Sequence, residues 1–414
     1  MRKLPAAAVL AALWLPTIAS AQGSTEAEIA ALRAEIEQLM ERLERLERRT
    51  ASEAVAEADT ADGGTSQDDD EEGAIELDAA RETSPRLAFS GDLRYRHESI
   101  DETGERSRNR HRVRARLGAE AVLADDLTVE FVLATGGDDP VSANQTLGSS
   151  FTRKDFGVDR AWFDWRPTDR MRVAGGKMPN PFHRPGEHHL IFDRDLNPEG
   201  LALGYGFGDW FVNVAGFVVE ERGDAPDVLL FGGQLGYRTT LAGGARLTTG
   251  LSYYDYRATQ GSAPFYDGAA AGNRLDPLGR YLSDFDDAEA FAELELDARG
   301  RPLTLFADYV VNTAAARDDS GFAVGARYGE VTGRGGWAFG WAYQALEADA
   351  VVGTFTDSDF AGGGTDNEGH VLEMSYGLRE RWRLDARYFA NRRGADAGAE
   401  RDYDRLQIDV VFDY

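Results

Sequence analysis

The sequence predicts an antiparallel transmembrane β-barrel of about sixteen strands, preceded by a short coiled-coil helix. Three observations support this fold class. The chain begins with an export signal, it has no later apolar run long enough for a membrane-spanning helix, and residues 86–414 form alternating segments joined by short and long connections. An exported chain that crosses a membrane without such helices does so as a closed barrel, because lipid offers backbone polar groups no other partners.

Residues 1–21 have the features of a cleaved signal peptide. Arg2 and Lys3 precede an apolar run, and Ala19-Ser20-Ala21 forms a small-residue cleavage site. A membrane anchor is the alternative, but Pro16 and the small residues after it favour cleavage. The chain contains no cysteine, so it offers neither a disulfide framework nor a thiol ligand or nucleophile.

Residues 22–50 predict a coiled-coil oligomerisation helix in the periplasm. Apolar residues recur at spacings of 3, 4, 3, 4 and 3, the a/d seam of a heptad repeat, and charged residues fit pairs between helices. A single amphipathic helix is the alternative, but about 18 residues of isolated helix are marginal in water. The seam alone favours a coiled coil of two helices. The segment RLERLE resembles a trimerisation motif, and we therefore favour a homotrimer. The seam residues are Ile29, Leu32, Ile36, Leu39, Leu43 and Leu46.

Residues 51–85 predict a disordered acidic linker. They hold twelve Asp or Glu residues and one Arg, which gives a net charge of −11. An acidic functional tail is the alternative, but the composition favours a solvated spacer. The linker therefore carries much of the formal net charge of −27 of the chain.

The remaining residues, 86–414, alternate with the period of a β-strand. Leu127, Val129, Phe131 and Leu133 form one apolar face, with polar or small residues between them. Short connections are expected at 124–126, 168–169, 207–209, 241–244, 299–301, 334–336 and 380–381, and long ones near 137–156, 179–198, 258–284 and 349–366. Short turns at one rim and long loops at the other are typical of outer-membrane barrels.

A soluble β-helix or β-sandwich is the alternative fold for this region. Neither requires an aromatic-rich apolar face on nearly every strand over roughly 330 residues. The last residues, LQIDVVFDY, also alternate and end on Tyr414, which resembles the carboxy-terminal signal read by the outer-membrane assembly machinery.

Arginine occurs at every second position from 108 to 116, and valine, alanine and leucine occupy the opposite face of the same strand. Charge on the lipid face is costly, so the charged faces of this and other strands are expected to line a water-filled lumen. Opposed rows of cations and carboxylates would then set up a transverse field. The predicted pore-lining cations are Arg94, Arg96, Arg112, Arg114, Arg116, Arg160, Arg383 and Arg387. The predicted pore-lining carboxylates are Glu130, Asp164, Glu289, Glu293, Glu295 and Asp308.

Several motifs resemble the Gram-negative "putative porin" family, which is similar to the phosphate-selective porins O and P. They are RVRARLGAEAVLADDLTVEF, DDPVSANQTLG, DRAWFDWRP, GGKMPNPF and FDRDLNPEGLALGY, all within residues 86 to about 206. The resemblance implies a trimeric, 16-stranded passive channel. If the first strand rises from the periplasm, connection 179–198 is the third loop on the external side, and the resemblance implies that this loop folds into the lumen and narrows it.

Connection 179–198 has a composition that suits such a constriction. Pro179, Pro181 and Pro185 stiffen it. An ordinary surface loop is the alternative. The expected constriction residues are Lys177, His183, Arg184, Asp193, Arg194 and Asp195. We expect no metal here, because Pro198 stands where a calcium loop needs glycine and the adjacent His188 and His189 lack further placed ligands.

These observations favour an outer-membrane porin, without cofactor or enzymatic activity, through which small hydrophilic solutes or ions diffuse, with a possible preference for anions. Two other classes stay open: a non-conducting barrel that tethers the outer membrane to the cell wall, and a hydrolase. The hydrolase is disfavoured because neither G-x-S-x-G nor H-E-x-x-H occurs. Expected partners are outer-membrane lipid, the assembly machinery that reads Tyr414 and two further copies of the chain; the acidic charge argues against nucleic acid.

Replacing Ile36, Leu39 and Leu43 with Ser should weaken the oligomer and leave the barrel folded, because the change removes about 1.5–3 kcal/mol of burial per side chain from the seam. Melting of the oligomer on semi-native gels measures this. An unchanged melting temperature would show that the helix has no part in assembly.

Overall fold

The computed structural model describes residues 86–223 and 225–414 of the chain. The predicted signal peptide (1–21), coiled coil (22–50) and acidic linker (51–85) lie outside the described residues, so these three predictions stay predictions. Within the described ranges, no helix is long and apolar enough to span a membrane.

The described residues are almost entirely strands and their connections. The strands are β1 (Arg86–Glu102), β2 (Arg108–Ala124), β3 (Leu127–Thr135), β4 (Gln145–Thr146), β5 (Phe156–Thr168), β6 (Met171–Lys177), β7 (Glu199–Phe207), β8 (Trp210–Glu220), β9 (Val228–Thr240), β10 (Arg246–Arg257), β11 (Phe285–Asp297), β12 (Pro302–Asn312), β13 (Ser320–Glu330), β14 (Trp337–Leu346), β15 (Asn367–Arg379), β16 (Trp382–Arg393) and β17 (Arg401–Asp413). Three short 3₁₀ turns lie in the connections: η1 (Pro185–Glu187), η2 (Gly353–Phe355) and η3 (Phe360–Gly362).

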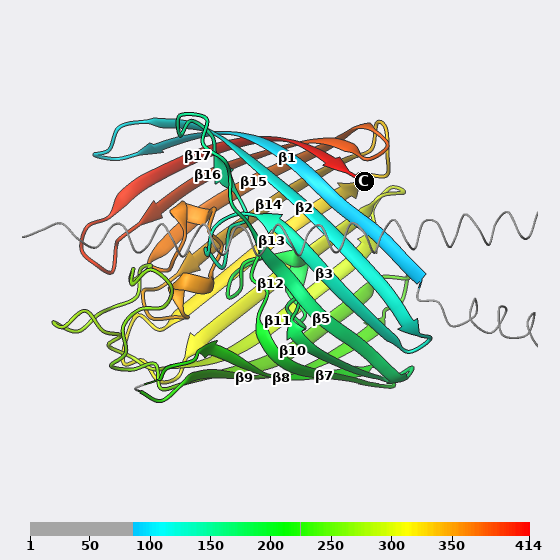
Figure 1. Ribbon diagram of the computed structural model, residues 1–414, viewed down its shortest axis with the longest axis horizontal. Helices are drawn as coiled ribbons and strands as arrows, with labels where there is room; N and C mark the ends of the chain where they lie inside the picture. Colours follow the sequence, from blue (N-terminus) through cyan, green and yellow to red (C-terminus); the bar gives the residue numbers. More distant parts are fainter. Residues whose placement is uncertain (1–85, 224) are drawn as a thin grey trace, which may run out of the picture. The chain divides into compact units, whose positions relative to one another are not determined.

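The long strands close into a single antiparallel barrel (Figure 1). Each pairs with the next in the chain, and β17 pairs with β1 from Asp92↔Asp413 to Glu102↔Tyr403. The two-residue β4 pairs only with β2, beyond the last residue that β3 pairs there, so it extends the position of β3 and adds no strand to the circumference. Sixteen long strands therefore form the wall, which confirms the predicted barrel of about sixteen strands; the coiled-coil helix of the predicted fold class stays untested.

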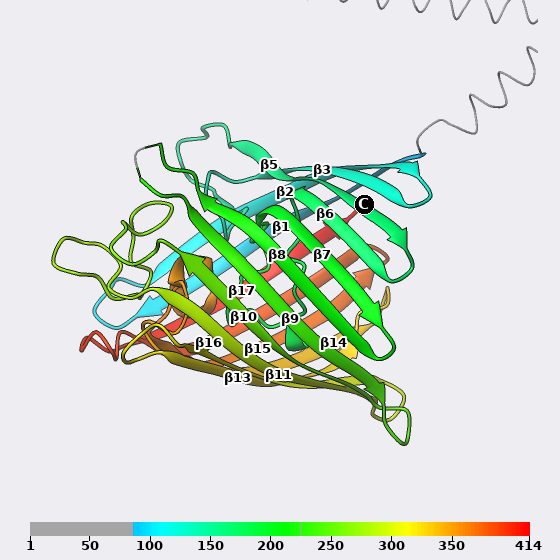
Figure 2. The ribbon, with the colours of Figure 1, turned by 90° about the horizontal axis from the view of Figure 1, so that it is seen from below.

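The two rims of the barrel differ in the length of their connections (Figure 2). At one rim the strands are joined by two- to six-residue turns such as 125–126 and 208–209, and at the other by loops such as 136–155 and 258–284. These positions agree with those predicted from the sequence. The chain enters the barrel and ends at the short-turn rim, where Tyr414 N–H donates to the carbonyl of Gly91 at 3.0 Å.

The outer surface of the wall is apolar. Exposed side chains alternate along each strand, as Leu93 and Tyr95 do on β1 and Leu251 and Tyr253 do on β10. Exposed aromatic residues ring the wall next to the short turns: Trp165, Tyr205, Trp210, Tyr376, Trp382 and Tyr414. Others, including Tyr253, Tyr309 and Phe322, lie toward the long loops. Two aromatic belts that border an apolar band match the two interfaces of a bilayer.

The C-terminal Tyr414 closes the seam between the first and last strands. Its hydroxyl donates to the carbonyl of Arg116 on β2 at 2.8 Å, so the side chain reaches across β1. A Cβ at Gly91 would collide with the Tyr414 ring, which explains why glycine occupies this position on β1. The terminal aromatic thus has a structural role in addition to the assembly signal that the sequence predicts.

The interior of the barrel is filled in part by its own loops. Met178, Phe182, Leu190, Ile191 and Phe192, all from the connection between β6 and β7, belong to the main buried apolar cluster. They pack with inward residues of the wall, among them Tyr254, Tyr256 and Phe285. An apolar core inside a barrel whose wall otherwise presents charge shows that this connection lies within the lumen.

Leu251→Arg, near the middle of β10, should impair insertion, because a charge on the lipid face near the midplane costs about 2–4 kcal/mol. Thr248→Arg is the matched control on the same strand, since Thr248 lines an interior cavity with Glu293 and Glu295. Refolding into lipid vesicles, followed by the heat-dependent shift on gels, compares the two. Equal folding yields would contradict the assignment of the two faces.

Candidate functional site

The connection between β6 and β7, residues 178–198, follows the inner wall of the barrel and is called here the 178–198 loop. It first contacts β9, β10 and β11. Phe182 packs edge-on against Tyr254 with ring centroids 5.0 Å apart. The backbone N–H of His183 donates to Gln234 Oε1 at 2.7 Å, and that of Gly186 donates to Glu293 Oε2 at 2.6 Å. The first third of the loop is therefore fixed to one side of the wall.

The middle of the loop continues to β12, β13 and β14. His188 stacks on Phe306 at 5.3 Å and shares a 2.9 Å hydrogen bond between its Nε2 and Gln344 Oε1. Glu187, which is 85% exposed, has a carboxylate oxygen 3.8 Å from Arg327. In this part of the loop the carboxylate of Glu187 is thus exposed to the lumen, whereas the imidazole of His188 faces the wall.

The last third of the loop lies against β2 and β5. Asp195 accepts from Arg116 Nη2 at 2.6 Å and lies 3.8 Å from Arg114 Nη1. Asn197 donates to Asp159 Oδ1 at 3.0 Å. Because its contacts run from β9 through β14 to β2 and β5, the loop forms a collar within the barrel.

The six expected constriction residues have different surroundings along this collar. His183 and Arg184 are partly buried against the wall, Lys177 pairs with Glu199 at 3.0 Å, and Asp195 is bound by the β2 arginines. Asp193 is buried: it accepts from Ser358 N–H through Oδ2 at 2.8 Å, and its own N–H donates to the Phe355 carbonyl. Arg194 is exposed and, among the described residues, has no carboxylate within 4.0 Å.

Burial shifts several ionisable groups of the loop. It lowers the pKa of His183 and of His189 to about 4, so both imidazoles are neutral near pH 7. It raises the pKa of Asp193 well above the usual range, and the nearby Asp357 and Asp195 add to this shift. Burial alone would raise the pKa of Asp195, but Arg116 and Arg114 outweigh it and hold the pKa of Asp195 low.

The arginines of β1 and β2 face the interior and hold loops to the wall. Arg94 Nη2 donates to Asn144 Oδ1 at 2.6 Å, and Arg116 binds Asp195 as described. Arg96 makes two 2.7 Å hydrogen bonds to Asp409 and a 3.0 Å one to Asp359.

Arg112 and Arg114 complete the set of five inward arginines that were predicted on β1 and β2, and they have different partners. Arg114 binds Asp92 on the wall at 2.7 Å. Arg112 has only 3.4 Å contacts to Ser142 Oγ and the Asn144 carbonyl, and no carboxylate within 4.0 Å in the described ranges. Four of the five guanidiniums thus serve as wall or loop anchors.

The remaining predicted charges also point inward, but most are paired locally and do not form two opposed rows. Arg160 lies 3.2 Å from Glu130, and Asp164 binds Arg172 and Arg166 at 2.8 Å. Glu295 pairs with Arg246, Arg383 with Asp385 at 2.8 Å, and Arg387 with Glu373 at 2.9 Å. Glu289, Glu293 and Asp308 are at most 8% exposed, and Glu293 accepts from Gly186 N–H of the 178–198 loop. The expected transverse field is therefore replaced by neighbouring ion pairs.

Sequence reasoning missed several charged groups inside the barrel. Glu98 and Arg405 form a fully buried pair across the seam between β1 and β17, and Asp409 binds Arg96 across the same seam. The period-two pattern of β17 placed Arg405 and Asp409 on its polar face and was the signal that could have identified them. Asp359 lies in an irregular loop, where no periodicity indicates orientation.

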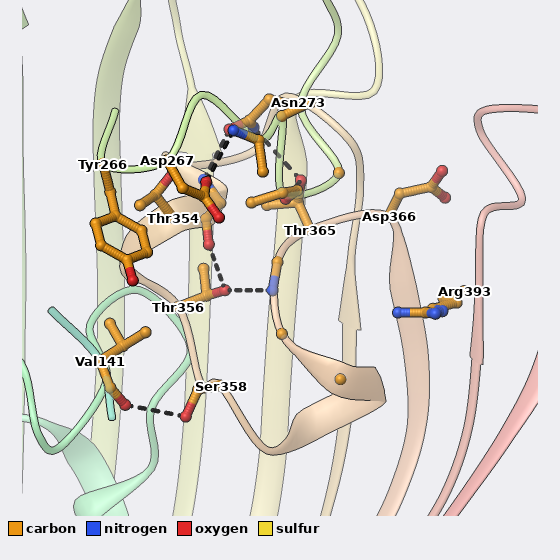
Figure 3. Close-up of a pocket in the computed structure, with 18 of the residues that line it drawn as sticks. Val141, Tyr266, Asp267, Asn273, Thr354, Thr356, Ser358, Thr365, Asp366 and Arg393 are labelled. Atoms are coloured by element: carbon orange, nitrogen blue, oxygen red, sulfur yellow. Dashed lines mark hydrogen bonds between the residues drawn. The ribbon is translucent and has the colours of Figure 1, made fainter. Parts of the chain in front are cut away.

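A cavity of about 770 Å³ opens among the long loops. Its charged lining comprises Arg110, Arg112, Arg393, Arg401, Glu102, Asp139, Asp267 and Asp366. Figure 3 shows Arg393 and Asp366 on one side of it and Tyr266 and Asp267 on the other. The hydroxyls of Ser358 and Thr356 are already engaged, with the Val141 carbonyl at 3.0 Å and the Gly364 N–H at 3.1 Å. This polar entrance suits hydrated solutes of either charge better than apolar ones.

The family model described as "Putative porin" matches residues 57–274 and 283–413. The chain belongs to this porin family. No curated protein matches its sequence.

Among solved structures, that of OprB from Pseudomonas putida at high pH is similar to this porin. The TM-score is 0.56 at 15% identity, over 83% of this chain and 97% of the other. The OmpF structure of Salmonella typhi in complex with daunomycin has a TM-score of 0.50 at 10% identity, over 80% and 99%. At such identities the likeness concerns the fold alone, and it agrees with the closed antiparallel barrel described above.

We expect the packing of the 178–198 loop in this porin to loosen as the pH falls from about 6.5 to 4. An unfolded histidine takes up its proton near pH 6.5, whereas folded His183 and His189 resist it until about pH 4. The stability that each imidazole contributes is therefore fully present above pH 6.5 and falls by about 3 kcal/mol toward pH 4. Hydrogen exchange of the loop amides, corrected for the intrinsic rate, measures the effect. A His183→Gln, His189→Gln double variant should flatten it, and an equally steep dependence in that variant would contradict the assignment.

Proposed function

We propose that this porin forms a water-filled channel through which small hydrophilic solutes and ions diffuse passively, with a weak preference for anions. The observation that carries the proposal is the inner surface of the sixteen-stranded wall, which is lined by ionised side chains while the outer surface is apolar. Charge on the lumen side is stable where water reaches it or where an opposite charge pairs with it, whereas the same charge facing lipid would be costly. The membership of the porin family supports the same function.

The preference for anions rests on the charges that remain accessible beside the 178–198 loop. Glu187 and Glu373 each have an arginine within 4.0 Å, Arg327 and Arg387 respectively. Arg194 is exposed there without a carboxylate partner among the described residues. An uncompensated cation at a narrow section favours anions over cations of the same size.

The assembly that we propose is a homotrimer, with the short-turn rim at the periplasm and the long loops outside the cell. Short periplasmic turns and long external loops are the rule for outer-membrane barrels. This orientation places the start of β1 at the periplasmic rim, which agrees with a signal-directed export route and a periplasmic coiled coil of residues 22–50. Insertion would depend on Tyr414 as the signal for the assembly machinery.

Planar bilayers containing the purified full-length protein test the function directly. Stepwise conductance increases and a reversal potential of the anion-selective sign in a KCl gradient are the expected results. A barrel that inserts but never conducts would support the tether interpretation instead. Conduction with a cation-selective reversal potential would support the channel function and contradict the proposed preference for anions.

Arg194→Glu should shift the reversal potential toward cation selectivity, because it reverses an exposed charge inside the collar. The conductance should change by less than about twofold, since Arg194 holds no loop in place. Arg257→Glu at the end of β10 is the control, as it makes the same charge reversal at a side chain that is 65% exposed outside the collar. Equal shifts for the two variants would show that charge at the collar does not control permeation.

A further inference from the structure

The connection between β14 and β15, residues 347–366, is a second loop that folds onto the interior of the barrel, and it is called here the 347–366 loop. Val351, Val352, Phe360 and Ala361 are at most 1% exposed. η3 contacts β15, β16 and β17, and Phe360 packs edge-on against Phe389 of β16 at 6.3 Å. The loop is therefore bound to the part of the wall that carries the seam.

Asp359 is the main polar attachment of this loop. Its carboxylate accepts from Arg96 Nη1 at 3.0 Å and from Arg405 Nη2 at 2.7 Å, and it lies 4.0 Å from Arg387 Nη1. Its backbone carbonyl accepts from Arg405 Nη1 at 3.0 Å. One loop side chain thus joins arginines from β1, β16 and β17, and the Arg96 and Arg405 side chains are only 1% and 2% exposed.

The charge of the loop matches that part of the wall. Residues 347–366 contain five carboxylates and no Lys or Arg, so their formal charge is −5. The wall opposite presents the guanidiniums of Arg94, Arg96, Arg387 and Arg405. Placing this loop against another part of the wall would leave the Asp359 carboxylate without its cationic partners and would remove one of the counter-charges of Arg96 and Arg405, at a desolvation cost.

The 347–366 loop also supports its neighbours. Ser358 N–H and the Phe355 carbonyl hold Asp193 of the 178–198 loop, and Ser358 Oγ donates to the Val141 carbonyl of the 136–155 connection at 3.0 Å. Asn273 donates to the carbonyls of Ala348 and Val351 at 2.8 Å. Three other long loops are therefore attached to it, and the collar depends on its position.

We propose that the 347–366 loop is a second constriction element, that Asp359 is the residue that positions it, and that this loop sets the solute size limit of the porin together with the 178–198 loop. The inference rests on the proposed channel function. Without Asp359 the loop would lose its charged attachment and move out of the lumen, which would widen the narrowest section and expose arginines to it.

The barrel should tolerate the loss of Asp359. Each arginine that Asp359 joins keeps a second carboxylate on the wall: Asp409 for Arg96, Glu98 for Arg405 and Glu373 for Arg387. No buried arginine of this group would thus be left without a counter-charge. A variant at this position tests the placement of the loop and not the closure of the sheet.

Three variants of the full-length porin, measured in planar bilayers, distinguish a role of Asp359 in positioning the loop from a role as a pore charge. Asp359→Ala removes the charged attachment, and Phe360→Ala removes the apolar one without changing charge. Glu187→Ala deletes an exposed lumen carboxylate whose one ionic contact, with Arg327, is 3.8 Å long, and so matches the charge change of Asp359→Ala. For Asp359→Ala and Phe360→Ala, but not for Glu187→Ala, we expect roughly 1.5- to 2-fold higher single-channel conductance and a higher size limit for polyethylene glycols. Asp359→Ala and Glu187→Ala should both shift the reversal potential toward greater anion selectivity, because each removes a negative charge.

The outcomes distinguish the inference from the function on which it rests. A wild-type protein that does not conduct would overturn the proposed function. A conducting wild type with unchanged conductance and size limit in Asp359→Ala and Phe360→Ala, both shown to be folded by their heat-dependent gel shift, would overturn the second constriction. A change of selectivity alone in Asp359→Ala would show that Asp359 acts as a pore charge and positions nothing.

Discussion

Closure of the sheet between β1 and β17 is the constraint on which the interior of this porin depends. In lipid every backbone amide and carbonyl of the wall needs a partner, so the last strand must find the first. On the inner side of this seam, Arg96 binds Asp409 and Arg405 binds Glu98, each across the junction of the two strands. Buried charges of this kind are stable only as pairs, so the seam is held in register by its side chains as well as by its backbone.

The same guanidiniums connect the wall to the loops. A guanidinium has five N–H donors, more than one wall carboxylate accepts. Arg96 uses its remaining donors for Asp359, and Arg116 and Arg94 bind Asp195 and Asn144. The arginines that alternate along β1 and β2 therefore fix the loops that narrow the lumen, whereas Arg112 on β2 and the exposed loop residue Arg194 have no carboxylate within 4.0 Å among the described residues. The cations that hold the pore in shape are largely different from those that a passing ion would meet.

The wall could be predicted from the sequence because its residues obey a local rule. Alternation places Leu305 and Tyr309 outside and Asp308 inside without knowledge of any other strand. The partners of the inward charges could not be predicted in this way, since Arg96 and Asp409 are separated by 313 positions in the chain. Nor could periodicity show that Glu293 would be buried under the 178–198 loop, where it accepts from Gly186 N–H, because the burial of this carboxylate depends on the path of a loop. The inward fold of the 178–198 loop was expected from the family resemblance, whereas residues 347–366 gave no such signal.

The distribution of charge explains why so acidic a chain lines its barrel with arginine. Residues 51–85, which precede the first strand in the sequence, account for −11 of the formal charge of −27, and residues 347–366 carry a further −5 in one connection. The loop carboxylates of Asp359 and Asp195 and the wall arginines that bind them attract each other through the low-dielectric interior more strongly than they would in open water. A loop held only by apolar packing would need a continuous apolar strip on the wall, and such a strip would repel the hydrated solutes that a channel admits. Ion pairs hold the loops and leave the rest of the surface polar, so the arrangement that positions the constriction is also compatible with a water-filled lumen.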